Sequence, residues 1–186
     1  MARYFRLPGL LLAWLWLCVA NPLPALAATA AEIDRNVDAA LASLYRTSPA
    51  ALKLSKLTDY ILVFPRVIKA GLIIGGQYGQ GALRVNGETR GYYETVAASY
   101  GLQAGAQSFG YALFFMSDTA LEYLNRSGGW EIGVGPSVVV VDEGMAQTLT
   151  TTTVQEGVYA FIFSQQGLMA GLGIQGSKIN RIVPDQ

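Results

Sequence analysis

The sequence predicts an α+β fold, in which N-terminal helices pack on a strongly bent, mainly antiparallel β-sheet (a small barrel or sandwich) with one inserted helix. Two observations support this fold class. Apolar residues recur at helical spacing from residue 31 to 46, and from residue 60 onward the chain consists of short β-branched, aromatic and small-residue runs with frequent glycine. Helices, then strands, one further helix and strands again are typical of an α+β domain with an antiparallel sheet.

The beginning of the chain has the three parts of a secretory signal peptide. Two arginines precede an apolar run from Leu7 to Ala20, which is shorter than a typical membrane span. Ala25-Leu26-Ala27 then supplies a small-x-small cleavage site. We therefore expect that residues 1–27 are removed and that residues 28–186 form a single domain in the periplasm.

Two other outcomes stay open for this N-terminal segment. The first is an uncleaved anchor, and the second is a lipoprotein anchored at Cys18. The residue before Cys18 is the bulky Leu17, where lipid-attachment sites prefer a small side chain. We therefore rank the lipoprotein below the cleaved, exported protein.

The composition excludes several classes of function. The chain has 13 basic and 13 acidic residues, and a nucleic-acid-binding protein would be strongly basic. It has no histidine, and its one cysteine lies in the segment expected to be lost, so no disulfide and no Cys/His zinc site can form. We expect no nucleic acid, no metal and no cofactor. An enzyme that uses a pair among Glu94, Glu131 and Glu156 is the least favoured alternative.

Two helices are predicted ahead of the sheet. The first has one apolar stripe and is acidic at Glu32, Asp34 and Asp38, which suits docking on its own domain better than contact with an anionic surface. Ser48-Pro49 is typical of an N-cap followed by proline at the first helical position. A second, short helix is therefore expected to run through Lys56.

Turn signals divide the remaining chain. The run "YILVFP" predicts a short buried strand that ends at Pro65, and Asn86-Gly87 predicts a hairpin with a type I′ turn. The inserted helix is expected to begin after Ser117 or Asp118 and to stop before Gly128-Gly129. Strands then continue to the end of the chain.

A glycine pattern occurs three times, at Gly71–Gly75, Gly101–Gly105 and Gly167–Gly171. If each copy is a strand, alternation places its glycines on one face; in the first copy Gln77 shares that face and Tyr78 lies on the other. Glycine in a strand marks bending, a bulge or a close approach, so we expect a tightly coiled sheet. A groove for an extended ligand such as an acyl chain is the alternative. A phosphate-binding loop is not predicted. The first copy lacks the ending of a P-loop, and no helix follows the Gly-rich stretch at Gly171–Gly176 as a dinucleotide-binding loop requires.

Four basic residues lie within seventeen positions, namely Lys53, Lys56, Arg66 and Lys69, and only Asp59 opposes them. One interpretation is a patch that binds anionic lipid headgroups, each cation contributing about 1 kcal/mol at an anionic surface. The other is an ordinary solvated face.

Four segments occur in an order that characterises one family: "KAGLIIGGQYGQGAL", "ASYGLQAGAQSFGYALFFMSDTALEYL", "WEIGVGPSVVVVD" and "VYAFIFSQQGLMAGLGIQGSKI". From about Leu52 to Ile182 the chain thereby resembles the SYLF domain family. This resemblance implies a non-enzymatic, lipid-associated module. Eukaryotic members bind phosphoinositide-containing membranes, and yeast relatives bind and bundle actin. The family's lipid binding is attributed to an N-terminal amphipathic segment and basic residues, for which the four cations are the nearest candidates here.

We therefore expect a lipid-binding or membrane-associated module of the cell envelope. Its ligand would be an anionic phospholipid or another envelope lipid, held at headgroups by Lys53, Lys56, Arg66 and Lys69. The alternative is a structural or protein-interaction module of the periplasm that has no lipid ligand.

Overall fold

The computed structural model describes residues 28–72, 74–100, 105–142, 145, 157–167 and 174–185. The predicted signal peptide with Cys18, Glu156, and all but one residue of the second and third glycine copies lie outside these ranges. Within the described residues the helices are α2 (Ala30–Thr47), α3 (Pro49–Leu54) and α4 (Asp118–Leu124). The strands are β1 (Tyr60–Gly71), β2 (Ile74–Val85), β3 (Glu88–Tyr100), β4 (Gly105–Phe115), β5 (Trp130–Glu131), β6 (Val138–Val140), β7 (Val158–Gly167) and β8 (Lys178–Ile182).

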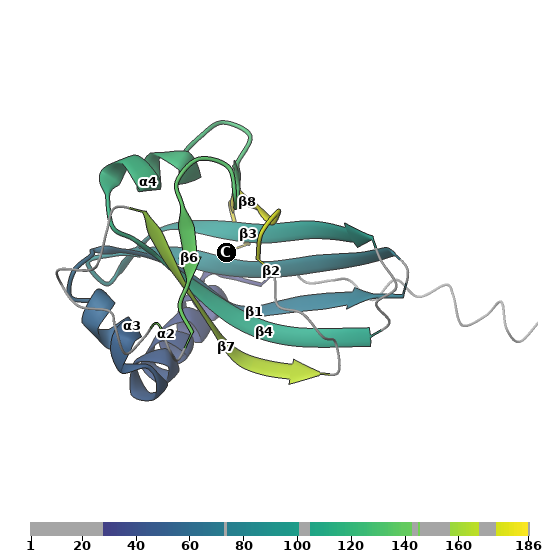
Figure 1. Ribbon diagram of the computed structural model, residues 1–186, viewed down its shortest axis with the longest axis horizontal. Helices are drawn as coiled ribbons and strands as arrows, with labels where there is room; N and C mark the ends of the chain where they lie inside the picture. Colours follow the sequence, from purple (N-terminus) through teal and green to yellow (C-terminus); the bar gives the residue numbers. More distant parts are fainter. Residues whose placement is uncertain are drawn as a thin grey trace, which may run out of the picture.

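The strands form one curled sheet, a half-barrel with the order β5-β8-β3-β2-β1-β4-β7-β6 (Figure 1). Every neighbouring pair is antiparallel except β6 and β7. The predicted α+β class, the N-terminal helices on a bent sheet and the inserted helix are confirmed. The curl stops at a half-barrel, so the sheet keeps two edge strands.

The predicted helix starts are confirmed by their caps. Thr29 and Glu32 form a capping box at α2, Ser48 caps α3 ahead of Pro49, and Ser117 caps α4. The second helix ends at Leu54 and not at Lys56, because the chain enters a turn over residues 55–57. None of the described helices combines the length and apolar composition needed to cross a bilayer.

The first glycine copy is a hairpin, which corrects the expectation of a single strand. β1 does not end at Pro65 but continues to Gly71, and a bulge interrupts its pairing with β2 between Val63 and Arg66. Proline has no N–H to donate to the ladder, and it is tolerated here because a bulge interrupts the ladder. The chain then turns, so that Gly71 pairs with Gly75. The two glycines still share a face, now on neighbouring strands.

Glycines of β2 and β4 make room for this bulge. A Cβ on Gly81 would lie 2.0 Å from the Val63 carbonyl oxygen, and one on Gly110 would lie 2.8 Å from that of Pro65. Backbone groups cannot move aside as a flexible side chain can. These glycines are therefore needed for the close approach of the bulged backbone, as the bend-or-bulge interpretation predicts.

Each face of the sheet has its own apolar core. Helices α2 and α3 cover one face, hereafter the α2 face, where Ile61, Val63 and Phe114 are buried. The other face, hereafter the α4 face, packs Phe64, Tyr111 and their neighbours against α4 and β5. The two ends of the described chain meet, since Thr29 and Asp185 form a parallel bridge and the Ala30 N–H donates to the Asp185 carbonyl at 3.1 Å.

Candidate functional site

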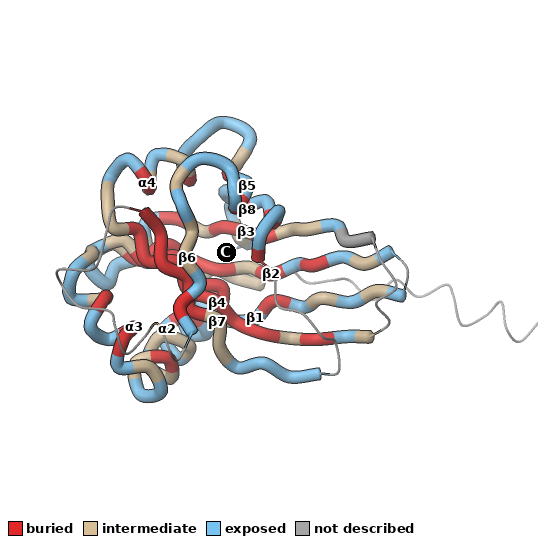
Figure 2. Tube along the Cα trace, viewed as in Figure 1, coloured by how far each residue is buried: buried red, intermediate tan, exposed pale blue. Residues whose placement is uncertain are grey.

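One end of the sheet extends beyond the helices. This distal end carries the β1–β2 turn, the end of β3, the start of β4 and the end of β7, whose registers pair Gly71 with Gly105 and Gln107 with Gly167. In Figure 1 the three helices lie toward the opposite end of the sheet. Figure 2 shows buried residues concentrated there, whereas the strand tips at the distal end are largely exposed.

Four large apolar side chains are exposed at the distal end, and together they form what we call the distal apolar surface. Leu72 is 71% exposed, Ile74 73%, Ile68 49% and Tyr78 48%. Ile68 and Tyr78 are paired across β1 and β2, and both lie on the α2 face because Val67 and Gly79 beside them face α4. Helices α2 and α3 thus cover only part of their face.

Two cations of β1 lie toward the distal end, and Glu94 of β3 shares a face and a register row with one of them, Arg66, across Gln80. Residues 60–81 contain Arg66 and Lys69 but no Asp or Glu, and residues 95–117 contain no charged residue at all. Arg66 is exposed on the α2 face, opposite Gln80. Lys178 of β8 lies at the margin of this region, and Glu131 of β5 is paired with it in the register. The distal apolar surface therefore adjoins a positive region of two strands without a carboxylate.

The four predicted headgroup-binding cations do not lie together. Lys53, on α3, and Lys56, in the turn after it, are exposed at the helical end of the molecule. Lys53 lines a cleft of about 780 Å³ between the two N-terminal helices and β7. Lys69 is three residues from Arg66 and therefore points to the opposite, α4 face. Arg66 and Lys69 thus both lie toward the distal end but on opposite faces of β1, and the binding of the four cations to lipid stays a prediction.

A polar row crosses the α4 face at the distal end. Lys69 lies between Gln77 of β2 and Gln107 of β4, each directly across from it in the register. The Gln77 side-chain amide donates to Ser177 Oγ at 3.2 Å, whereas the buried Gln107 Oε1 has no partner among the described residues. The nearby Tyr111 is fully buried, and this burial raises the pKa of its hydroxyl, an effect that the Thr95 hydroxyl partly offsets.

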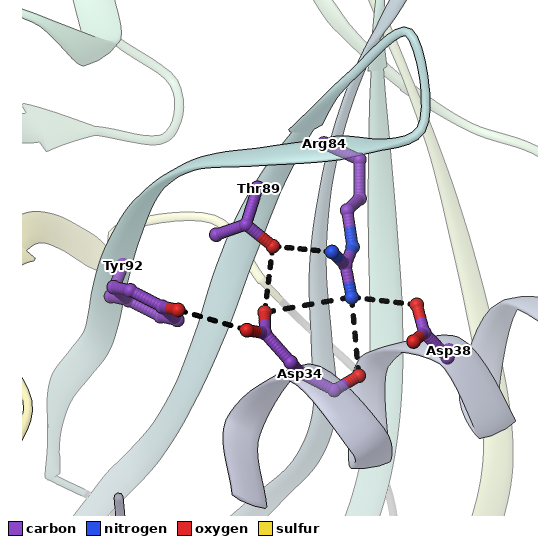
Figure 3. Close-up of polar contacts among 5 residues, drawn as sticks. All are labelled: Asp34, Asp38, Arg84, Thr89 and Tyr92. Carbon is purple, nitrogen blue, oxygen red and sulfur yellow. Dashed lines mark hydrogen bonds and ion pairs between the residues drawn. The ribbon is translucent and has the colours of Figure 1, made fainter. Parts of the chain in front are cut away.

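A second polar cluster lies between α2 and the sheet (Figure 3). The Arg84 guanidinium donates to Asp38 Oδ1 at 2.6 Å, to the Asp34 carbonyl at 3.2 Å and to Thr89. The Asp34 carboxylate accepts from Thr89 Oγ1 at 2.6 Å and from the Tyr92 hydroxyl at 2.9 Å. The expected docking of the acidic helix on its own domain is confirmed. Sequence reasoning missed Arg84, whose signal was a lone cation between apolar residues of a strand.

The candidate carboxylates do not form an obvious pair. Glu94 accepts a hydrogen bond from the Asn180 amide at 3.2 Å, whereas Glu131 pairs with Lys178 in the register of β5 and β8. Glu156 lies outside the described residues. Within the described ranges, no three His, Cys, Asp or Glu side chains come together as a metal site would require.

A family model described as "Ysc84: Las17-binding protein actin regulator" matches residues 96–182, from the last part of β3 to the end of β8. No curated protein matches the chain significantly. The family is one of binding domains, whose members are known in general as regulators that bind actin or lipid. The resemblance is thereby confirmed over residues 96–182, where the chain matches the model of the Ysc84, or SYLF, family.

Proposed function

We propose that the protein is a non-enzymatic module that associates with anionic phospholipid surfaces of the cell envelope through the distal end of its sheet. The observation that carries this proposal is the distal apolar surface beside Arg66 and Lys69, on strands without a carboxylate. Monomeric proteins rarely expose neighbouring large apolar side chains unless a partner or a membrane covers them. A lipid surface offers both an apolar interior and negative headgroups.

The expected strength of this association is modest. Burial of a fully exposed Leu or Ile side chain is worth roughly 1.5–3 kcal/mol, and a cation at an anionic surface about 1 kcal/mol. Leu72, Ile74, Arg66 and Lys69 then contribute roughly 5–8 kcal/mol together. This corresponds to a dissociation constant between about 1 and 200 µM. We infer reversible, peripheral binding.

The periplasm is the proposed location, on the strength of the signal-peptide features of residues 1–27. Phosphatidylglycerol and cardiolipin are anionic lipids that such an envelope offers. The family's description names an actin regulator, but an exported protein of this kind would not meet actin, so lipid is the partner that we propose. The alternative is a periplasmic protein-interaction module.

Co-sedimentation with vesicles tests the proposal. Vesicles of phosphatidylglycerol in phosphatidylcholine should bind the protein, and vesicles of phosphatidylcholine alone should bind it at least about tenfold more weakly. The double variant Leu72→Ser/Ile74→Ser should lose about tenfold or more in affinity, because each change removes an inserting side chain.

The matched control is Val183→Ser, since Val183 is 97% exposed but lies after β8 and not at the β1–β2 turn. Its binding should equal that of the unaltered protein. If the double variant bound as tightly as the control, the distal apolar surface would not be the membrane contact. A stoichiometric protein partner recovered without lipid would favour the alternative module.

A further inference from the structure

We infer that the polar row on the α4 face is a site for one phospholipid headgroup, in which Lys69 binds the phosphate and Gln107 accepts a hydrogen bond from the headgroup alcohol. This inference rests on the proposed membrane association, because it assigns a specific site beside the surface that would enter the bilayer. It concerns the face of the sheet opposite to Ile68 and Tyr78.

The register places the three side chains of the row in one line. Lys69 is directly opposite Gln77 on one side and Gln107 on the other. Neighbouring strands are about 4.8 Å apart, so one headgroup can contact Lys69 and a flanking amide at once. The next row toward the turn consists of Gly75, Gly71 and Gly105. On these three strands, no side chain therefore stands between the row and the end of the sheet.

Lys69 has no anionic partner in the described part of the chain. None of the three ion pairs found there includes it, and no hydrogen bond joins it to either glutamine. The row itself holds neutral amides, and β1, from Tyr60 to Gly71, has no carboxylate. Lys69 itself is only partly exposed. A bound phosphate would supply the missing negative charge.

Gln107 shows which further group the ligand should carry. Its side-chain oxygen is buried, the residue being 7% exposed, and it has no hydrogen-bond donor among the described residues. Buried acceptors are almost always paired. A ligand with a hydroxyl group close to its phosphate would satisfy Gln107 and Lys69 together. The glycerol headgroup of phosphatidylglycerol has both groups, whereas a choline headgroup has no donor.

The depth of the row agrees with a headgroup ligand. Lys69 lies two residues before Gly71, or about 7 Å along the strand. The polar layer of one leaflet is about 5–7 Å thick. If Leu72 and Ile74 enter the acyl region, Lys69 therefore lies at the level of the phosphates.

The test uses short-chain phosphatidylglycerol below its micelle concentration, titrated into the full protein and followed by NMR. Short-chain phosphatidylcholine is the comparison ligand, and glycerol phosphate and inorganic phosphate separate headgroup recognition from binding of any phosphate. We expect phosphatidylglycerol to bind best. Lys69→Gln should weaken it at least about tenfold, and Gln107→Met should remove the preference over phosphatidylcholine. The control Arg46→Gln, which changes an exposed cation in the last turn of α2, should change neither.

The outcomes separate this site from membrane association itself. Unchanged phosphatidylglycerol affinity in Lys69→Gln, or equal affinity for phosphatidylglycerol and inorganic phosphate, would overturn the headgroup site. Leu72→Ser/Ile74→Ser should reduce vesicle binding and leave short-chain phosphatidylglycerol binding intact. Vesicle binding that needs Leu72 and Ile74 but not Lys69 would refute only the headgroup site. Because Gln107 is buried, Lys69→Gln decides the matter if Gln107→Met fails to fold.

Discussion

At the residue scale, Arg84 holds the first helix on the sheet. Its side chain is 10% exposed and contacts two carboxylates of α2, of which Asp34 is 32% and Asp38 69% exposed. Because Asp34 also accepts from Thr89 and Tyr92, it is tied to β3 even without the guanidinium. The cluster fixes the position of α2 and turns the Asp34 carboxylate toward the protein, whereas Asp38 remains mostly exposed.

Replacing this arginine tests its role. Arg84→Met should lower the free energy of unfolding by about 2–3 kcal/mol, because Asp34 and its neighbours lose a charged donor in a partly buried place. Asp38→Asn is the matched variant, and should cost less than about 1 kcal/mol since Asp38 is mostly solvated. Urea denaturation of both variants measures the difference. Equal losses would contradict the central position that we assign to Arg84.

At the scale of elements, the bulge in β1 explains the glycines of β2. Gly81→Ala should lower the free energy of unfolding by more than about 3 kcal/mol, because its Cβ would lie 2.0 Å from the Val63 carbonyl oxygen and a backbone group would have to shift. Gly76→Ala, on the same strand, is the control, since its Cβ would have only the Ala97 carbonyl oxygen nearby, at 3.9 Å. Thermal unfolding should rank the two. A stable Gly81→Ala protein would show that the bulge can relax.

How far elements can be predicted from sequence depends on how local their causes are. The caps at Ser48 and Ser117 and the Asn86-Gly87 turn, where both residues have positive φ, depend on neighbours a few positions away and were predicted. The turn after Gly71 was missed, because an apolar run with glycine at both ends fits a strand equally well. The candidate site could likewise be predicted only as far as its causes were local. Lys69 was identified by its charge, but its face and its glutamine neighbours depend on the bulge and on pairing with β4.

At the scale of the whole molecule, the helices leave one end of the sheet bare, and this asymmetry predicts an orientation on a membrane. Ile74→Trp should show a blue-shifted emission when anionic vesicles are added, because residue 74 would enter an apolar environment. In the mature chain expected after cleavage at Ala27, Trp130 is the only native tryptophan, and it is 2% exposed, so its own emission should change little. Leu57→Trp, in the turn after α3, is the control and should show no shift. A shift for Leu57→Trp alone would mean that the opposite end faces the lipid.

The bridge between Thr29 and Asp185 has a practical consequence for engineering. Since the two ends of the described chain are hydrogen-bonded neighbours, a tag fused to either end of the domain would emerge from nearly the same point. A circular permutant, with the old termini joined by a short linker and new termini opened between Asn86 and Gly87, should keep the fold, because exposed turns tolerate such cuts.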